Sequence, residues 1–322
     1  MITEKKIFVV PELEGQKRLD IFLVEHLQLS RGEIQKMIKN NKVQVNGKLP
    51  KKAGDMIRQG DAIDVYFIEE EPVEVSQEDL ELYKKIEIIA DETDYIVINK
   101  PAGLLVHPTQ ADEPATLAHW LVQKYPGIRG VGENAERPGI VHRLDREASG
   151  LMVVAKNQKA FEHLKAQFKQ REVEKFYTVL VHGVVEAQHD TLDFEIDRGN
   201  DGRMVSRPKT DKLALDKVYK RQPGKTALTE FWVEKVFVNF TLLKVKIHTG
   251  RTHQIRVHMY AYNHHVVGDE LYHQHRGRKY DKQLGRLFLH AQRLVFQNTQ
   301  GESVDYELKL PKELSLFLQT LK

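Results

Sequence analysis

An acidic segment divides this sequence into two parts of very different size. Seven acidic residues and no basic residue lie between Glu69 and Glu81, with Pro72 among them. A stretch with so much like charge repels itself and cannot bury enough apolar surface to fold alone. We therefore expect a small domain at residues 1–70, an acidic linker at residues 71–85 and a large domain at residues 86–322.

The composition is that of an ordinary folded protein, with 41% apolar and 30% charged residues. No apolar run approaches the roughly 18 residues that a membrane helix requires, and lysine and glutamate interrupt the first residues. The sequence thus predicts neither a membrane segment nor a signal peptide. The absence of cysteine excludes disulfides and thiolate metal sites and favours the cytoplasm.

Basic residues are concentrated in the small domain, although the net charge of the chain is only +3. Between Arg31 and Gly60 the basic residues outnumber the acidic ones, which are Glu33 and Asp55. A capping box of Ser30 and Glu33 predicts a short helix with lysines on its open side. Charge alone leaves open whether this block is a solvated surface or binds nucleic acid. The candidate nucleic-acid-binding residues in it are Arg31, Lys36, Lys39, Lys42 and Lys48.

Strand and helix patterns interleave in the large domain without a regular βαβ period. Residues 95–99, 151–155 and 243–247 have the apolar or alternating pattern of strands, whereas residues 116–124 and the segment after Asn157 have helical spacing. This order favours an α+β domain with a largely antiparallel mixed sheet flanked by helices and loops.

Two polar segments carry the candidate chemistry. Residues 142–150 form a loop dense in ionisable groups between expected strands at 140–141 and 151–155, where a rigid scaffold can hold a reactive side chain. Its Asp145 is either a catalytic carboxylate or an ordinary turn residue. In residues 250–258, Thr252 is expected to cap a helix, and Arg251 at the start of that helix can pair with a carboxylate or a phosphate.

The histidines between residues 253 and 275 raise the question of a metal site. His253 and His258 are five residues apart, well over a quarter turn from each other on a helix, and no His-Glu-x-x-His motif occurs. The sequence also lacks a P-loop and a Gly-x-Ser-x-Gly elbow. We therefore expect no metal ion and no nucleotide cofactor.

The run from Gly139 to Lys156, with His142-Arg143-Leu144-Asp145 inside it, resembles the signature of the RluA-type pseudouridine synthases. Further matches follow the family's order at residues 99–103, 106–108, 175–177, 249–258 and 289–291. Residues 1–70 resemble an S4 RNA-binding module, through residues 18–20, 30–31, 43–47 and 60–61. His273 and the Gln297-Asn298 pair depart from the family's pattern, which bears on substrate contacts more than on chemistry.

The resemblance implies a pseudouridine synthase fold joined to a small α/β S4-like domain. It also implies that Asp145 is the catalytic aspartate, Arg251 its ion-pair partner and Tyr177 both the ring stacked on the base and a candidate proton shuttle at C5. Isomerising uridine breaks the N1–C1′ bond and joins C5 to C1′, so an ionised carboxylate is needed to stabilise or trap an electron-poor intermediate. No cofactor is required. Beside the basic block, the loop residues expected to contact RNA are His142, which otherwise orders the loop, Arg143 and Arg146.

Family members with an S4 module mostly modify ribosomal RNA of the large subunit, so this is the expected partner, for a chain that acts as a monomer. Transfer RNA is the alternative substrate for the same chemistry. A non-catalytic RNA-binding protein of ribosome assembly on the same scaffold is an alternative of another class. A glycoside hydrolase would need a second acid near Asp145, and Glu147 is the nearest.

Overall fold

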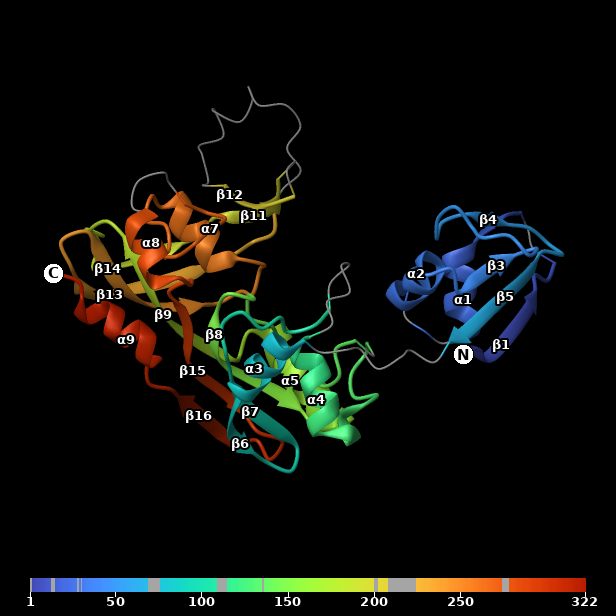
Figure 1. Cartoon of the computed structure of the whole chain (residues 1–322), viewed down its shortest axis with the longest axis horizontal. Coiled ribbons are helices and arrows are strands. Elements are labelled where there is room, and N and C mark those ends of the chain that lie inside the picture. Colours follow the sequence, from blue (N-terminus) through green and yellow to red (C-terminus); the bar gives the residue numbers. More distant parts are fainter. Residues whose placement is uncertain are drawn as a thin grey trace, which may run out of the picture. The chain divides into compact units, whose positions relative to one another are not determined.

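The computed structural model describes residues 2–12, 15–27, 29, 31–68, 76–108, 115–134, 136–199, 202–207, 224–273 and 278–322. The chain divides into two compact units, Met1–Glu74 and Val75–Lys322 (Figure 1). Over the described residues, no helix has both the length and the apolar character to cross a membrane.

The smaller unit packs an antiparallel sheet against two helices. Its elements are β1 (Ile2–Val9), β2 (Lys17–Arg18), α1 (Leu19–Leu27), α2 (Arg31–Lys39), β3 (Val43–Val45), β4 (Met56–Ile57) and β5 (Ala62–Ile68). Strands β1 and β3 flank β5, and β2 pairs with β4. Phe22, Ile34 and Ile63 lie in one apolar core that joins the helices to the sheet. The helix predicted in the basic block is confirmed as α2, while its predicted cap, Ser30, lies outside the described residues.

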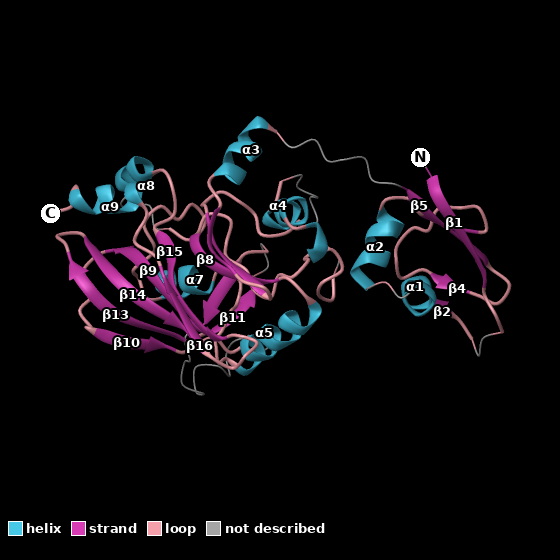
Figure 2. Cartoon of the chain, turned by 90° about the horizontal axis from the view of Figure 1, so that it is seen from below, coloured by secondary structure: helices cyan, strands magenta, loops and turns pink. Residues whose placement is uncertain are grey.

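A mixed sheet forms the centre of the larger unit (Figure 2). Its strand order is β10-β13-β14-β9-β15-β8-β7-β6, and β16 pairs with β15. All of these pairs are antiparallel except β8 with β15, which are parallel. The predicted α+β fold with a largely antiparallel mixed sheet is therefore confirmed. The strands are β6 (Glu87–Asp91), β7 (Tyr95–Lys100), β8 (Ser149–Ala155), β9 (Glu174–His182), β10 (His189–Leu192), β13 (Thr229–Val236), β14 (Phe240–Ile247), β15 (Leu289–Gln297) and β16 (Ser303–Glu307), while β11 (Glu195–Arg198) and β12 (Met204–Arg207) pair separately.

Helices pack against this sheet, and the sequence predicts those at residues 117–124, 158–170 and 254–261 but not the others. The helices are α3 (Gln77–Lys84), α4 (Leu117–Lys124), α5 (Gln158–Gln170), α7 (Gln254–Ala261), α8 (Arg278–Leu284) and α9 (Lys312–Gln319), with a 3-10 turn at Pro126–Ile128. Thr116 caps α4 and Asn157 caps α5 through their side-chain oxygens, as strong N-cap residues do. Helices α8 and α9 lie beside each other at one end of the sheet (Figure 2). Phe240, Phe288 and Phe317 belong to the apolar cluster that joins these helices to the sheet.

The acidic segment is not a linker along its whole length. Residues 77–84 form α3, whereas residues 71–75 lie outside the described residues. Ser76 accepts a hydrogen bond from the Asp79 backbone N–H, and acidic side chains in the first turn suit the positive end of the helix dipole. Tyr83 is buried in the main core, and its hydroxyl donates to the Thr116 carbonyl at 3.1 Å. The expectation of a linker over residues 77–85 is thus wrong, because Tyr83 and Ile86 anchor the segment.

Candidate active site

The loop that carries Asp145 is held at both ends by β8 and its neighbours. Before the loop, Ile140 makes only an isolated bridge with Val154, so the short strand expected at residues 140–141 does not form. After it, Gly150 has φ 121° and lies against β15, where an added Cβ would come within 2.3 Å of the Ala291 carbonyl oxygen. Only glycine permits this approach, which fixes where the loop enters β8.

His142 orders the start of the loop. Its Nε2 accepts a hydrogen bond from the Val153 N–H at 3.0 Å, and its ring stacks on Phe168 with 4.6 Å between ring centres. Burial, with a smaller effect of the Lys175 charge, lowers the pKa of His142 to about 3, so the ring is neutral at neutral pH. Of the two roles expected for His142, ordering the loop and contacting RNA, these contacts favour the first.

Lys100, whose role the sequence did not predict, holds the loop by a hydrogen bond to the Arg146 carbonyl. The ammonium group is fully buried and donates to the carbonyl oxygens of Pro101 and Leu104 at 2.8 Å and of Arg146 at 3.3 Å. Burial lowers the pKa of Lys100 to about 7, although the charge of Asp145 acts in the opposite direction. The buried Lys100 side chain therefore holds the backbone directly after Asp145.

Arg256 on α7 is the arginine that contacts Asp145. Its Nη1 lies 3.4 Å from Asp145 Oδ2, and the two side chains are 2% and 15% exposed. Asp269 accepts from the other edge of the guanidinium, at 2.7 Å from Nε and 2.8 Å from Nη2. Burial alone would lower the pKa of Arg256, but the hydrogen bonds to Asp269 and the charges of Asp269 and Asp145 raise it. The guanidinium thus stays charged and lies in a fixed plane beside Asp145.

The predicted ion pair between Arg251 and Asp145 is corrected by this geometry. Arg251 Nε donates to the Thr226 carbonyl at 3.1 Å instead. The predicted cap is wrong as well, since the N-cap of α7 is His253, in the left-handed conformation and without a side-chain cap bond. Helix α7 therefore begins at Gln254, which turns Arg256 inward and leaves Arg251 outside the helix.

Tyr177 lies close to Asp145 from the centre of the sheet. It is 6% exposed and sits on β9 between Val245 of β14 and Ala291 of β15. Burial raises the pKa of Tyr177, and the charge of Asp145 adds a smaller increase, so the phenol is protonated at neutral pH. The structure thus brings together the two residues that the sequence assigns to the carboxylate and the ring.

Arg143 and Arg146 are exposed loop residues on either side of Asp145. Arg143 Nη1 lies 3.2 Å from His107 Nε2, and His107 Nδ1 lies 3.0 Å from the Pro108 carbonyl oxygen. Burial lowers the pKa of His107, so its neutral ring donates from Nδ1 and accepts from Arg143 at Nε2. His107 is a positioning residue that the sequence analysis missed, although it belongs to the quoted segment 106–108.

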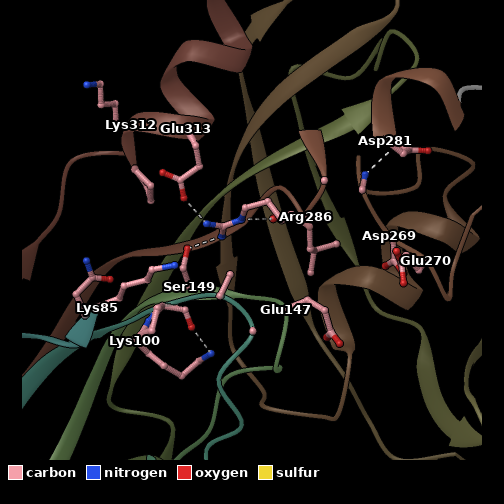
Figure 3. Close-up of a pocket in the computed structure, with 18 of the residues that line it drawn as sticks. Lys85, Lys100, Glu147, Ser149, Asp269, Glu270, Asp281, Arg286, Lys312 and Glu313 are labelled. Carbon is pink, nitrogen blue, oxygen red and sulfur yellow. Dashed lines mark hydrogen bonds and ion pairs between the residues drawn. The ribbon is translucent and has the colours of Figure 1, made fainter. Parts of the chain in front are cut away.

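A groove opens beside Arg256 and runs toward α9 (Figure 3). Glu147, Asp269 and Lys100 line its end near the loop, and Lys312 lies near α9. Arg286 crosses it, donating to Ser149 Oγ at 2.7 Å. A concave, charged surface that Arg256 lines can hold a polar substrate, although Asp145 and Tyr177 are not among its lining residues. It lies within a single unit of the chain.

The predicted RNA-binding residues of the smaller unit lie on and after α2. Lys36 and Lys39 are on α2, and Lys42 and Lys48 flank β3. Arg31 Nε bonds the buried Asp20 carboxylate at 3.0 Å, and Arg18 forks onto the same carboxylate. Arg31 therefore also has a structural part in this unit.

Within the described part of the chain, one group of side chains could hold a metal ion. It consists of His182, His265 and Asp281. None of these side chains contacts Asp145 in the described hydrogen bonds and ion pairs, although Asp281 also lines the groove.

Comparisons with known proteins agree with this architecture. A family model described as RNA pseudouridylate synthase matches residues 94–261, and an S4 domain model matches residues 17–63. An uncharacterized RNA pseudouridine synthase of Aquifex aeolicus is 38% identical over 94% of this chain and 93% of its own length. One of Bacillus subtilis is 34% identical over 97% and 96%, respectively. The solved human RNA pseudouridylate synthase domain containing 1 is 28% identical, with a TM-score of 0.57, and the match covers 71% of this chain and 85% of that one.

Proposed function

The chain belongs to the RNA pseudouridylate synthase family, and we propose that it isomerises specific uridines of large-subunit ribosomal RNA with Asp145 as the catalytic carboxylate. The observation that carries this proposal is the contact of Asp145 with Arg256, beside Tyr177 and at the end of a polar groove. An S4 domain next to the synthase domain supports an RNA substrate of this kind.

Asp145 acts as an anion that is held ready before the substrate arrives. Arg256 Nη1 lies 3.4 Å from Asp145 Oδ2, and because Asp269 fixes the guanidinium, little reorganisation is needed during the reaction. The carboxylate can then stabilise or trap the electron-poor intermediate that forms when the N1–C1′ bond breaks.

Tyr177 offers the face of its ring to the uracil while the base turns. Since burial keeps the phenol protonated, Tyr177 is a poor acceptor for the proton that C5 must lose. Water or the Asp145 carboxylate is the better acceptor. Tyr177 therefore stacks on the base through its ring, and its hydroxyl does not accept the C5 proton.

The target uridine must leave its stack before Asp145 can reach it, which costs a few kcal/mol and least in loops. Arg143 and Arg146 flank Asp145 on the same loop, and we assign to them contacts with the displaced strand. His107 holds Arg143 for that purpose. The basic residues of the S4 unit add phosphate contacts, so RNA binding weakens as salt rises.

Tritium release from RNA labelled at C5 of uridine tests the catalytic assignment. Asp145→Asn keeps the shape of the side chain and removes its charge, so release should stop while RNA binding stays nearly unchanged. Asp305→Asn, at an exposed ion pair with Arg293, is the matched control and should retain release. Undiminished release by Asp145→Asn would refute the mechanism, and absence of release by the wild-type chain would favour the non-catalytic alternative.

Mapping pseudouridines in ribosomal and transfer RNA, from cells with and without the gene, tests the substrate. We expect sites to disappear from large-subunit ribosomal RNA. Loss confined to transfer RNA would identify the alternative substrate. We also propose that the chain works in the cytoplasm as a monomer, which fractionation and analytical ultracentrifugation check.

A further inference from the structure

Three side chains with metal-binding atoms meet beside the last residue of β9. His182 ends β9 and donates its backbone N–H to the carbonyl of His265, while Asp281 comes from α8. Their ligand atoms all lie within 4.8 Å of one another. His182 Nε2 is 2.9 Å from Asp281 Oδ1. Three elements that are far apart in the sequence thus supply two imidazoles and one carboxylate.

His265 is the member whose chemistry is unexplained by the protein contacts. Its side chain is 3% exposed, and neither ring nitrogen has a hydrogen-bond partner in the described structure. Buried polar atoms are normally bonded, so an exception calls for a partner such as an ion. An imidazole whose ring nitrogens have no protein partner is able to bind a metal ion.

We propose that His182, His265 and Asp281 bind one divalent transition-metal ion, with Zn²⁺ as the best match. Histidine nitrogen and carboxylate oxygen are established zinc ligands, and water can fill a fourth position. The 2.9 Å between His182 Nε2 and Asp281 Oδ1 is close to the edge of a tetrahedron with bonds of about 2.0–2.1 Å, which is roughly 3.3 Å. This site goes beyond the proposed RNA chemistry and does not depend on it.

Binding requires a local rearrangement of the two imidazoles. The rings stack with 4.2 Å between centres and 17° between planes, so their in-plane lone pairs do not yet point at one position. Rotation of the rings about their side-chain bonds would make the lone pairs converge. Asp281 lines the groove, which gives an ion and its water a route from solvent.

The ion would fasten the framework around the active site without touching the substrate. Asp281 Oδ1 accepts from the Gly268 N–H at 2.7 Å, and the next residue, Asp269, holds Arg256. Gly268 has φ 78° and lies so close to the Arg286 carbonyl that no side chain fits. A metal that fixes Asp281 therefore fixes the segment that orients Arg256, which is a stabilising role rather than a catalytic one.

A second set of histidines and a carboxylate supplies an internal control. Glu230 bonds His189 through Oε1 and His248 through Oε2, each at 2.9 Å. These two contacts use different oxygens, and the His189 side chain is 50% exposed. We therefore expect no shared ion there, and His189→Ala is a matched histidine deletion.

Calorimetric titration of the full chain with Zn²⁺ tests the proposal. We expect the wild-type chain to bind one Zn²⁺ ion. His265→Ala should lower the Zn²⁺ affinity by more than about 100-fold, which exceeds the loss caused by removing a residue that only hydrogen-bonds to a metal ligand. His189→Ala should leave the Zn²⁺ affinity unchanged. The proposal fails if the wild-type chain binds no Zn²⁺, if His265→Ala binds equally well, or if His189→Ala loses the ion.

X-ray absorption of the zinc-loaded wild-type chain gives a test that does not depend on a variant folding. The expected spectrum contains two imidazole ligands and light-atom neighbours. A spectrum with fewer than two imidazoles overturns the assignment. Pseudouridine formation is not part of either measurement, so failure of this proposal is distinguishable from failure of the proposed function.

Discussion

Asp269→Asn should destabilise the larger unit far more than an equivalent change at the surface. Asp269 is fully buried, with Oδ2 accepting from Arg256 Nε and Oδ1 accepting from Arg256 Nη2 and from the backbone N–H groups of Leu271 and Tyr272. An asparagine oxygen can replace Oδ1, but its NH₂ group would then face the Arg256 Nε–H donor.

The size of the effect follows from the burial of the charge that remains. Arg256 is 2% exposed, and after the change its nearest carboxylates are Asp145 at 3.4 Å and Glu147 at 3.5 Å. Removing one partner of a buried ion pair costs about 3–5 kcal/mol, because the other charge stays desolvated. We expect a loss of that order in the free energy of unfolding.

Urea unfolding followed by tryptophan fluorescence measures this loss. The two tryptophans of the chain, Trp120 and Trp232, both belong to the larger unit, so their signal does not report on the S4 unit. Asp305→Asn is the control, since it breaks an ion pair with Arg293 whose side chains are 34% and 46% exposed, and such pairs contribute about 1 kcal/mol or less. An equal effect of the two substitutions would contradict the reasoning.

Three further outcomes follow from the contacts. Arg256→Lys should lower kcat strongly, because a lysine cannot bond Asp269 through two nitrogens and also reach Asp145. Arg251→Ala should instead raise KM with little change in kcat, because Arg251 bonds the Thr226 carbonyl and not Asp145. Single-turnover assays measure the effect on the reaction step, and binding assays measure the effect on affinity. Tyr177→Phe should keep most activity and Tyr177→Leu should lose it, which tritium release would show. In the S4 unit, hydrogen bonds from Arg18 lower the pKa of the Asp20 carboxyl group, despite the burial of Asp20. The stabilisation that Asp20 contributes is therefore present above the unfolded pKa of about 3.9 and is lost as the pH falls below that value. NMR signals of residues 1–74 in the full chain report this loss.

Local patterns predicted the elements whose structure depends mainly on neighbouring residues. The helices predicted at residues 116–124 and after Asn157, and the alternation of Leu243, Val245 and Ile247 in β14, are confirmed. Such features need only a few adjacent residues, because a cap or a strand face is set within one or two turns of chain.

Features that depend on tertiary contacts were not predictable in the same way. The acidic charge of residues 77–84 led to the prediction of a linker, whereas the burial of Tyr83 sets the position of α3 there. The choice between Arg251 and Arg256 depended on the phase of α7, and a cap expected at Thr252 gave the wrong phase. The histidine pair at His182 and His265 is a contact between neighbouring segments, so spacing along one helix could not reveal it.

Because Arg256 and not Arg251 contacts Asp145, the position of the reactive carboxylate depends on the segment that contains Asp269. Arg256 reaches Asp145 only through a guanidinium edge that Asp269 leaves open, and Asp269 is itself fixed by backbone donors in the following turn. A substitution beyond the motif that carries Arg256 can therefore lower the reaction rate without touching the RNA. Had Arg251 been the partner, the same substitution would have left Asp145 unaffected, because Arg251 is held by Thr226 instead. The rate of Asp269→Asn thus distinguishes the two arrangements independently of its effect on stability.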